Sequence, residues 1–489
     1  MGGIAQPCQG LAEVEWALAR ARSGALTLRV GGQSVHSAYD PGGEARARAR
    51  AIALAAREEG ADAVALLGTG LGLLPEALRR ELAGELLLFE PFPGLRRALE
   101  EVGAAPDGPQ AETRAAGLEA TLAGWAAAGR RVHVAPHPGY TELCRFELRL
   151  AARALRRALG APALPALGHA VVSPRSLEAL VRFPGRRTLA ELAGSCQGQT
   201  ALLVAPGPSL AEALPALAAR RGGVVFAAVQ ALRPLAEAGV RVDFAVAPDP
   251  LHSLPFLSGF EPRFGLLLAE AGAEPGLLDR WPERTALFAL RSSQLYDLAF
   301  AACGEAPLDE PLNTVSETML LLARRLGARR LAFVGVDLCG EQKGVFRARR
   351  ASGSPALTNS HYLHAARYLS WRCPALAAEG CELWRVGDGL PLEGARQIAA
   401  AELPGLLAAA PPFEPLPAAP AAPDARRLAV ARELLERAAA LPPAARPRGA
   451  APGVDPRNRW SCFADLPGPA RADACREALA RLSGAVAGP

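Results

Sequence analysis

The sequence predicts an α/β protein built around a Rossmann-like central domain, and three observations indicate this fold class. Apolar runs at residues 201–205, 224–229 and 244–247 alternate with helical segments, which is typical of a parallel sheet with helices on its faces. The first run ends in a Pro-Gly-Pro-Ser turn directly before a helix. Residues 63–90 repeat this layout of apolar run, glycine-rich turn and helix. We therefore expect a smaller Rossmann-like α/β domain to precede the central one.

Length and composition divide the chain further. A sequence of 489 residues exceeds the size of a typical single core. A tract rich in proline and alanine cannot hold a helix and indicates a semi-rigid linker, and helical segments follow it. The expected divisions are an N-terminal Rossmann-like α/β domain (residues 1–165), a central α/β domain (166–406), a Pro/Ala linker (407–424) and a helical C-terminal tail (425–489).

Charge, cysteine content and hydropathy exclude several classes of protein. The chain has 54 basic and 49 acidic residues, a mild net charge of +5, and much of the arginine lies in helical segments such as residues 46–50. This pattern is typical of solvated helix faces, so we expect no nucleic-acid partner. Nine dispersed cysteines without a CxxC pair fit a reducing compartment. Without a visible secretory signal or an apolar run of roughly 18 residues, we expect no membrane span and a cytoplasmic location.

The turn after residues 201–205 is the first candidate ligand site. Gly207, Pro208 and Ser209 stand where a predicted strand gives way to a helix. Unpaired N–H groups, the helix dipole and a hydroxyl would all favour a phosphate there. The alternative is that Ser209 caps the following helix and the turn is ordinary. Under the ligand hypothesis, Gly207→Val should abolish binding and leave the stability of the free protein nearly unchanged.

Two acidic residues end other predicted strands of the central domain. Asp249 follows the run at 244–247, and Asp337 follows the very apolar run at 330–334. Open parallel sheets gather their ligand-binding residues at the carboxyl ends of their strands. We therefore expect both carboxylates in one cleft with the turn at Ser209.

The glycine-rich turn of the N-terminal domain has two interpretations. Gly68, Gly70 and Gly72 follow a predicted strand, and Glu90 ends the next one, a layout similar to nucleotide sites and closest to S-adenosylmethionine-dependent enzymes. The pattern is also explained if the glycines permit tight packing and Glu90 caps the next helix, which is the interpretation we favour. His137 and Tyr140, in a Pro/Gly-rich turn after residues 131–135, could contact a ligand, although such a turn needs none.

A long segment after Asp337 carries basic residues, and a helix with two histidines follows it. Residues 339–359 lack a clear periodicity, which predicts a flexible cover over the active site. Its basic side chains would suit a polyphosphate or an acidic sugar, or would simply be solvated; they are Lys343, Arg347, Arg349 and Arg350. His361 and His364 lie one helical turn apart but lack a third ligand at recognisable spacing, so we expect no metal there. Either histidine could serve as a general base or a phosphate ligand.

Taken together, these motifs resemble the DUF115 family over residues 195–400. That family unites the motility-associated Maf glycosyltransferases with proteins similar to 6-hydroxymethylpterin pyrophosphokinase (MptE-like). The matching features are Gly207-Pro-Ser-Leu210, Gly239-Val-Arg-Val-Asp243 with Asp249, Asn313-Thr314, residues 331–338, and Gly389 with Glu393-Gly394. The N-terminal stretches GTGLG…LLLFEP and VHVAPHPGY also resemble the N-terminal domain of Maf proteins, which favours that branch.

The resemblance implies a sialyltransferase-like catalytic domain and a function. Maf proteins are thought to transfer a nonulosonic (sialic-acid-like) sugar from a CMP-activated donor to Ser/Thr hydroxyls of flagellin or another surface protein. It implies that Gly207, Pro208 and Ser209 approach the donor phosphate and that Asp249 and Asp337 line the cleft. We also assign donor binding to Asn313 and Thr314 at the start of a helix. A base for the acceptor hydroxyl would be Asp337, His361 or His364.

Two alternatives stay open at this point. The first is a diphosphotransferase that moves diphosphate from ATP to a pterin alcohol, for which Asp249 and Asp337 would be the only obvious carboxylate pair for Mg²⁺. The second is a non-catalytic nucleotide-binding protein, because sheets of this type host many activities. No cofactor is expected beyond the CMP-sugar substrate, and Mg²⁺ only under the first alternative.

Overall fold

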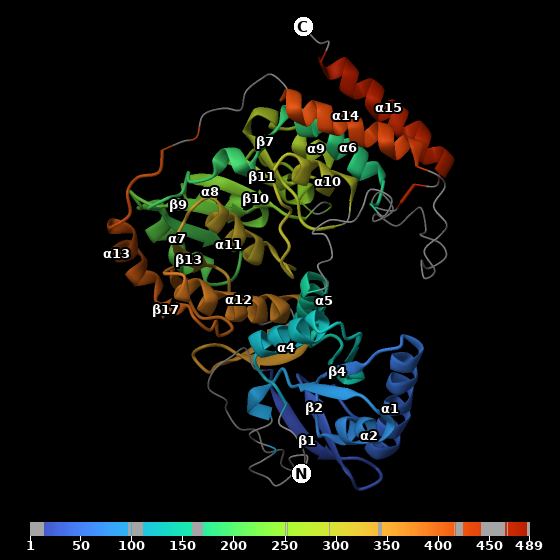
Figure 1. Ribbon diagram of the computed structural model, residues 1–489. Coiled ribbons are helices and arrows are strands. Elements are labelled where there is room, and N and C mark those ends of the chain that lie inside the picture. The colour runs from blue at the N-terminus through green and yellow to red at the C-terminus, as the bar shows by residue number, and fades with distance from the viewer. Residues whose placement is uncertain are drawn as a thin grey trace.

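The computed structural model describes residues 14–95, 99, 111–158, 170–249, 251, 253–292, 294–340, 345–414, 416, 424–441, 465–466 and 468–486. A small α/β unit that contains the N-terminal strands lies at one end of the molecule, and a larger α/β unit follows it (Figure 1). Two C-terminal helices lie at the opposite end. This arrangement confirms the predicted α/β class with a Rossmann-like core.

A nine-stranded sheet forms the larger unit. Its strand order is β17-β16-β13-β8-β9-β10-β11-β12-β7, and every neighbouring pair is parallel. Every residue of the central strands β8, β9 and β10 is buried, as expected for a parallel sheet covered on both faces. The strands are β7 (Arg187–Thr188), β8 (Thr200–Val204), β9 (Val224–Ala228), β10 (Val242–Ala247), β11 (Phe264–Glu270), β12 (Thr285–Phe288), β13 (Arg330–Val334), β16 (Glu382–Val386) and β17 (Arg396–Ile398).

The strand order reverses between β8 and β13. From β8 the chain builds β9, β10, β11 and β12 on one side, and then returns to place β13 on the other side of β8. The register pairs Val204 with Val334, so both strands end at the same level. In open parallel sheets, ligands bind in the crevice at the carboxyl ends of the strands where the order reverses. The fold therefore places the predicted turn of Pro206 to Ser209 at this switch point.

Helices cover both faces of the sheet. Residues of α7 and α8 pack with Leu202 and Val204 on one face, and residues of α11 and α12 pack with Leu203 and Phe333 on the other. Helices of this unit are α6 (Pro174–Arg182), α7 (Leu210–Ala218), α8 (Leu232–Glu237), α9 (Pro275–Leu278), α10 (Leu295–Ala302), α11 (Val315–Arg325), α12 (Ser360–Ala378) and α13 (Leu403–Ala408). Short 3-10 turns are η3 (Phe183–Gly185), η4 (Leu189–Leu192), η5 (Val229–Ala231), η6 (Leu254–Leu257), η7 (Pro282–Arg284) and η8 (Ala400–Glu402).

The N-terminal unit has two small sheets. One is parallel, in the order β5-β4-β6, and the other is antiparallel, in the order β1-β2-β3. The strands are β1 (Trp16–Arg20), β2 (Leu26–Val30), β3 (Gln33–Ser34), β4 (Ala63–Leu67), β5 (Glu85–Phe89) and β6 (Val132–Pro136), and the helical segments are α1 (Pro41–Glu58), α2 (Leu73–Glu81), α4 (Ala115–Ala127), η1 (Pro138–Tyr140) and α5 (Arg145–Ala158). The parallel sheet thus has the same alternation of parallel strands and helices as the central sheet, with fewer strands.

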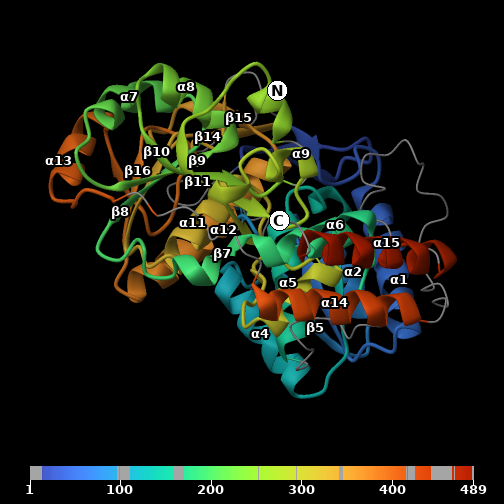
Figure 2. The same ribbon diagram turned by 90° about the horizontal axis from the view of Figure 1, so that it is seen from above.

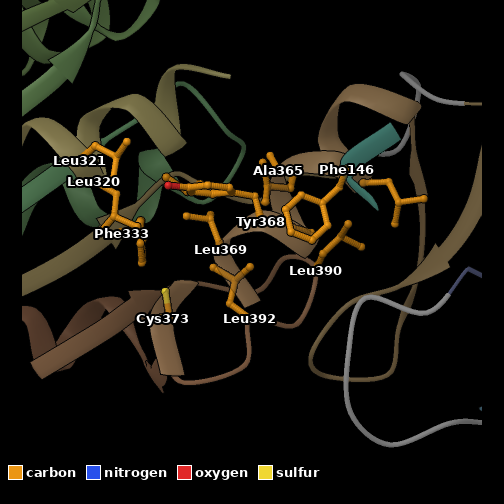
Figure 3. Close-up of a cluster of buried hydrophobic side chains, with 14 of the residues drawn as sticks. Phe146, Leu320, Leu321, Phe333, Ala365, Tyr368, Leu369, Cys373, Leu390 and Leu392 are labelled. Atoms are coloured by element: carbon orange, nitrogen blue, oxygen red, sulfur yellow. The ribbon is translucent and has the colours of Figure 1, made fainter. Parts of the chain in front are cut away.

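The two units share a continuous core. Phe146 of α5 lies 6.3 Å, ring to ring, from Tyr368 of α12. Figure 3 shows Phe146 beside Tyr368 and Leu390, with Leu369 and Phe333 continuing the apolar packing toward the large sheet. The packing of α5 against α12 is also visible in Figure 1.

The C-terminal tail packs on the edge of the large unit. Helices α14 (Ala425–Ala440) and α15 (Gly468–Val486) lie against each other and against α6 (Figure 2). Leu435 and Leu482 are buried in this contact, and Arg481 pairs with Glu178 of α6. Within the described ranges, no helix combines the length and apolar character that a bilayer crossing requires.

Candidate functional site

Ser209 and Asp337 meet at the switch point. Ser209 follows β8 and Asp337 follows β13, and the strand order makes these two loops neighbours. The Ser209 backbone N–H donates to Asp337 Oδ2 at 2.8 Å, and Ser209 Oγ donates to Asp337 Oδ1 at 2.5 Å. The Gly207 N–H donates to the Gly335 carbonyl oxygen at 2.8 Å. The structure therefore joins two residues that lie far apart in the sequence by direct hydrogen bonds.

These contacts change the role of the turn. The N–H groups of Gly207 and Ser209 are used within the protein, and Pro208 has no N–H. The Ser209 side chain makes no cap hydrogen bond to α7, so it is not an ordinary helix cap either. Ser209 and Asp337 are also only 8% and 1% exposed. The expectation that several unpaired N–H groups face a phosphate is therefore wrong for Gly207 and Ser209, because protein oxygens accept from both. A ligand at this turn would meet the dipole of α7 and the exposed prolines.

The packing around Gly207 leaves no room for a side chain. A Cβ atom at this position would lie 2.3 Å from the Gly335 carbonyl oxygen and 2.6 Å from Asp337 Oδ2. These are backbone and tightly held atoms that cannot move aside cheaply. The expectation that Gly207→Val leaves the free protein stable is therefore wrong, because the glycine is required by the fold itself.

A loop after β16 closes over Asp337 from the other side. The Leu390 N–H donates to the Asp337 carbonyl oxygen at 2.9 Å. A Cβ at Gly389 would lie 2.4 Å from that oxygen, and one at Gly387 would lie 2.4 Å from Ser209 Cβ. Leu338 has a φ of 56°, the one positive value at a non-glycine residue in the described part of the chain. The backbone is thus tightly constrained on both sides of Asp337.

A buried arginine lies under this loop, and the sequence analysis did not identify it. Arg385 is 2% exposed; its Nη1 donates to the Leu390 carbonyl oxygen, while Nε and Nη2 have no hydrogen-bond partner among the residues that the structure describes. Burial lowers the pKa of Arg385, and the nearby carboxylate of Asp337 acts in the opposite direction. The switch point therefore holds two buried opposite charges. Arg385 stands between Trp384 and Val386 near the end of β16, and a charge between apolar residues at a strand end was the signal that could have found it.

The segment predicted as a flexible cover forms an antiparallel hairpin. Its strands are β14 (Phe346–Arg349) and β15 (Pro355–Thr358). Ser352 at its tip donates from N and Oγ to the carboxylate of Asp388, at 3.0 and 2.6 Å, and the Ala351 N–H donates to the Gly389 carbonyl oxygen at 2.8 Å. The prediction of an irregular loop is wrong for residues 345–359, because these hydrogen bonds fix the hairpin to the loop above Asp337.

The arginines of this hairpin bind protein groups. Arg350 Nη1 donates to the Asp388 carbonyl oxygen at 3.1 Å, and Arg349 pairs with Glu15 of the N-terminal unit at 3.4 Å. The Arg347 backbone accepts from the Glu15 N–H at 2.8 Å, while its side chain is exposed. Lys343 lies outside the described residues. Two of the four basic residues thus have side-chain contacts within the fold.

Asn313 and His361 form a second polar contact, at the starts of α11 and α12. Asn313 Nδ2 lies 3.0 Å from His361 Nδ1. The Glu317 carboxylate accepts from the N–H groups of Asn313, at 2.6 Å, and Thr314, which fixes the first turn of α11. Because α11 and α12 each lead into a strand of the parallel sheet, their N-terminal ends lie at the carboxyl edge. His361 is largely exposed, but partial desolvation of its ring and the nearby Arg145 and Arg149 lower its pKa, which favours the neutral ring.

His364 has a different environment from His361. It is 2% exposed, and its Nε2 lies 2.6 Å from the Pro311 carbonyl oxygen, so Nε2 carries the proton. Burial lowers the pKa of His364 to about 3. Its ring packs edge-on against Phe146 of α5, 5.6 Å away. This position ties His364 to the contact between the two units and leaves it closed to an acceptor in solvent.

Asp249 lies at the carboxyl edge but well apart from Asp337. It follows β10, and its Oδ1 accepts from the Leu251 N–H at 2.8 Å. The order β13-β8-β9-β10 separates the two strands by three spacings, or about 14 Å. Carboxylates that share one Mg²⁺ must lie within a few ångströms of each other. The described residues also contain no group of three or more His, Cys, Asp or Glu side chains arranged for a metal ion.

In the N-terminal unit, protein side chains occupy the glycine-rich turn. Glu90 Oε2 accepts from the Thr69 N–H at 2.9 Å, from Thr69 Oγ1 at 2.7 Å and from the Gly70 N–H at 3.2 Å. Burial raises the pKa of Glu90. The Leu71 N–H donates to His36 Nε2 at 3.1 Å. The N–H groups that a nucleotide phosphate would use are therefore bonded to the protein.

The glycines of this turn lie against aromatic rings. A Cβ at Gly68 would lie 2.6 Å from the Tyr140 ring, and one at Gly70 would lie 2.6 Å from His36 Nε2. His137 is 4% exposed and packs edge-on against His36, with ring centroids 5.0 Å apart. This geometry agrees with the interpretation that the glycines permit tight packing. It also shows what His137 and Tyr140 contact.

A buried acid at the end of β11 was also missed by the sequence analysis. Glu270 is 3% exposed; its Oε1 accepts from Tyr296 Oη at 2.9 Å, and its Oε2 accepts from the Gly272 N–H at 2.6 Å. Burial raises the pKa of Glu270 to about 8. Its position at the end of an apolar run was the available signal, the same one that identified Asp249 and Asp337.

The protonation of Glu270 predicts a pH-dependent stability. Its pKa in the folded state lies above the ordinary value of 4.5, so the stabilisation by its neutral form is fully present below that value and is lost as the pH rises toward 8. We expect the free energy of unfolding to fall between pH 5 and pH 8, with a contribution from Glu270 on the order of 1 kcal/mol per pH unit. Urea unfolding at several pH values should show that the free energy of unfolding falls less steeply with pH in Glu270→Gln than in the wild-type protein. The exposed Glu283→Gln should keep the wild-type slope, and an unchanged slope in Glu270→Gln would contradict the prediction.

Comparison with known proteins adds a family match for part of the chain. Residues 175–343 match the family model described as 6-hydroxymethylpterin diphosphokinase MptE-like. This stretch is similar to that family. It extends from α6 past β13, so it includes both Ser209 and Asp337, whereas Arg385 and the loop after β16 lie beyond it. The predicted resemblance is confirmed for this part of the sequence.

One solved structure and the curated proteins complete the comparison. The Maf glycosyltransferase from Magnetospirillum magneticum AMB-1 shares 16% identity with the chain, over 87% of this chain and 74% of that protein, with a TM-score of 0.42. No curated protein gives a significant match.

Proposed function

We propose that this protein is a glycosyltransferase of the Maf type. It would transfer a nonulosonic sugar from a CMP-activated donor to Ser/Thr hydroxyls of a protein acceptor, such as flagellin or another surface protein, in the cytoplasm. The motifs that resemble the Maf branch support this proposal, together with the MptE-like match that covers Ser209 and Asp337. The sheet topology supports a nucleotide ligand at the carboxyl edge.

One observation favours sugar transfer over the diphosphokinase alternative. Asp249 and Asp337 stand three strand spacings apart, and both oxygens of Asp337 are bonded to Ser209. This separation supports the proposal, because the pair assigned to Mg²⁺ under that alternative would have to lie within a few ångströms to share one ion. A CMP-activated nonulosonic sugar departs with little covalent help, so its transfer needs a positioned donor, stabilised charge and a base.

We assign the predicted residues to donor binding and to positioning. The donor would lie along the carboxyl edge near Asp249, Asn313 and Thr314, with its phosphate facing the α7 dipole beside the turn at Gly207, Pro208 and Ser209. Asp337 would be a positioning residue, because its carboxylate holds Ser209 and is buried.

His361 is the remaining candidate for the base. The Asn313 amide nitrogen can only donate, so His361 Nδ1 carries the free electron pair of the neutral ring. The acceptor proton would pass to Nδ1 in place of this contact. The acceptor oxygen would form a bond to the anomeric carbon while the bond from that carbon to the CMP phosphate breaks and CMP leaves. A neutral His361 ring, favoured by its lowered pKa, is the form that can accept the proton.

A panel of ligands tests the proposal by thermal shift. CMP and CDP should raise the Tm, whereas ATP with Mg²⁺, S-adenosylmethionine and NAD should not. A ligand at 100 times its Kd stabilises the folded state by about 2.7 kcal/mol. The shift should shrink in Asp249→Asn and Asn313→Ala. It should persist in Glu382→Gln, an exposed carboxylate at the amino end of β16.

The variants also separate the alternatives. His361→Asn should retain the CMP shift and lose sugar transfer to an acceptor peptide, which places His361 in catalysis. A response to ATP with Mg²⁺ alone would instead support the diphosphokinase. Binding of CMP without any transfer by the wild-type protein would support the non-catalytic alternative.

A further inference from the structure

A cavity lies at the amino ends of strands β10 and β11, whereas the switch point lies at the carboxyl ends of the strands. It has a volume of about 450 Å³ and is lined by the first residues of β10 and β11, among them Val242 and Phe264. The remaining walls come from the end of α8, including Ala236, and from Phe413 and Leu416 after α13. This volume is within the range of sites for small organic molecules. The proposed transfer reaction does not use this edge of the sheet.

The walls of the cavity are mostly apolar and aromatic. Phe244, Phe264 and Phe413 line it together with Leu266 and Val240. Phe244 and Phe413 lie 5.6 Å apart, ring to ring, which gives one side of the cavity a continuous aromatic surface. Such walls favour a ligand with a flat or apolar body.

The charges at the cavity have an excess of cations. Asp243 is buried, and both of its oxygens are occupied: Oδ1 accepts from Arg241 Nε at 2.9 Å and Nη2 at 2.7 Å, and Oδ2 accepts from the Val225 N–H at 2.9 Å. Arg220 adds a second cation 3.3 Å from the same carboxylate. One buried anion thus faces two arginines.

Arg263 is the second arginine of the lining, beside Arg241. It is exposed, and no ion pair binds its guanidinium within the described ranges. A carboxylate or sulfonate beside Arg263 and Arg241 would gain a charge-assisted hydrogen bond without displacing the Asp243 contacts. A positively charged ligand would be repelled by these arginines.

We propose that this cavity binds a small organic anion with an apolar or aromatic body. The aromatic walls would hold the body, and Arg263 with Arg241 would hold the acidic group. The cavity is built from the Gly239-Val-Arg-Val-Asp243 motif, which the proposed transfer reaction leaves without a role. Because β10 runs from this cavity to Asp249 at the other edge, the two sites share a strand but not a ligand.

Fluorescence titration of the full-length protein with anilinonaphthalene sulfonate tests the proposal. Its neutral analogue N-phenylnaphthylamine has the same aromatic body without the acid. The sulfonate should bind about tenfold more tightly than the neutral analogue because of the arginines. Arg263→Glu should remove this preference, whereas Arg284→Glu, an exposed arginine outside the cavity, should keep it.

A second variant tests the place of binding. Ala236 is exposed in α8 and lines the cavity, so Ala236→Trp should fill it and abolish binding of both probes while the Tm stays within a few degrees. Saturating CMP should leave probe binding unchanged. The proposal is overturned if the wild-type protein binds neither probe, if it binds both equally, if binding survives Ala236→Trp, or if CMP competes with the probe.

Discussion

Replacement of Asp337 by asparagine is expected to lower the free energy of unfolding by about 2–3 kcal/mol, the range for losing a buried hydrogen bond to a charged group and leaving its donor unpaired. Asparagine keeps the shape of the side chain but offers one acceptor oxygen in place of two. Either the Ser209 N–H or its hydroxyl then loses its partner in a site that is 1% exposed. The buried Arg385 also loses the carboxylate that offsets its charge. Urea unfolding monitored by circular dichroism measures this change.

Two further variants separate the contributions. Ser209→Ala removes one of the two hydrogen bonds and should cost about 1–2 kcal/mol. Glu382→Gln neutralises an exposed carboxylate, whose ion pair with Arg330 spans 3.7 Å, and should change stability by no more than about 1 kcal/mol. If Asp337→Asn is as mild as Glu382→Gln, the contact between Ser209 and Asp337 does not hold the switch point together.

The positions of these groups were predictable from the sequence to different degrees. Apolar runs followed by Gly207, Asp249 and Asp337 located the carboxyl edge, because strand ends can be identified from local pattern. The pairing of β8 with β13 is a property of the strand order. That order depends on contacts between distant segments, so the bond from Ser209 to Asp337 could not be anticipated.

Side-chain partners explain the remaining differences. The hairpin of β14 and β15 lacks a strong apolar alternation, and its shape depends on hydrogen bonds to the Asp388 loop, more than 30 residues away in sequence. His361 and His364 look equivalent in the sequence, yet one is exposed and the other is packed against Phe146. The difference arises because α5 covers only one side of α12, which the sequence does not reveal.

The expected domain division at residue 165 stays a prediction. The parallel sheets of the two units are separate, as expected for two domains. However, one hydrophobic cluster runs from Phe146 through Tyr368 to Phe333. The strength of this shared interface therefore decides whether the two units unfold independently. Removal of one ion pair in the interface tests how strongly the units are coupled.

Arg367→Met is expected to destabilise the protein by about 3–5 kcal/mol. Arg367 of α12 pairs with Glu147 of α5; their side chains are 11% and 2% exposed. Arg367 Nη2 also donates to the Pro91 carbonyl oxygen at 2.7 Å, and its guanidinium lies 4.7 Å from the centroid of the Phe92 ring. Methionine fills a similar volume but leaves Glu147 charged and unpaired in the interface. Thermal and urea unfolding should show an earlier transition, and a split transition would show that the N-terminal unit then unfolds by itself.

A double-mutant cycle distinguishes the lost pair from lost packing. Glu147→Gln combined with Arg367→Met removes both charges, so it should be more stable than Arg367→Met alone. Arg372→Met on the same helix is the matched control, because Arg372 faces the half-exposed Glu379 at 3.5 Å and should cost no more than about 1 kcal/mol. Equal losses in Arg367→Met and Arg372→Met would mean that the ion pair with Glu147 does not join the units. A large loss only at Arg367, recovered in the double variant, would show that this buried charge pair couples the N-terminal unit to the sheet that carries the switch point.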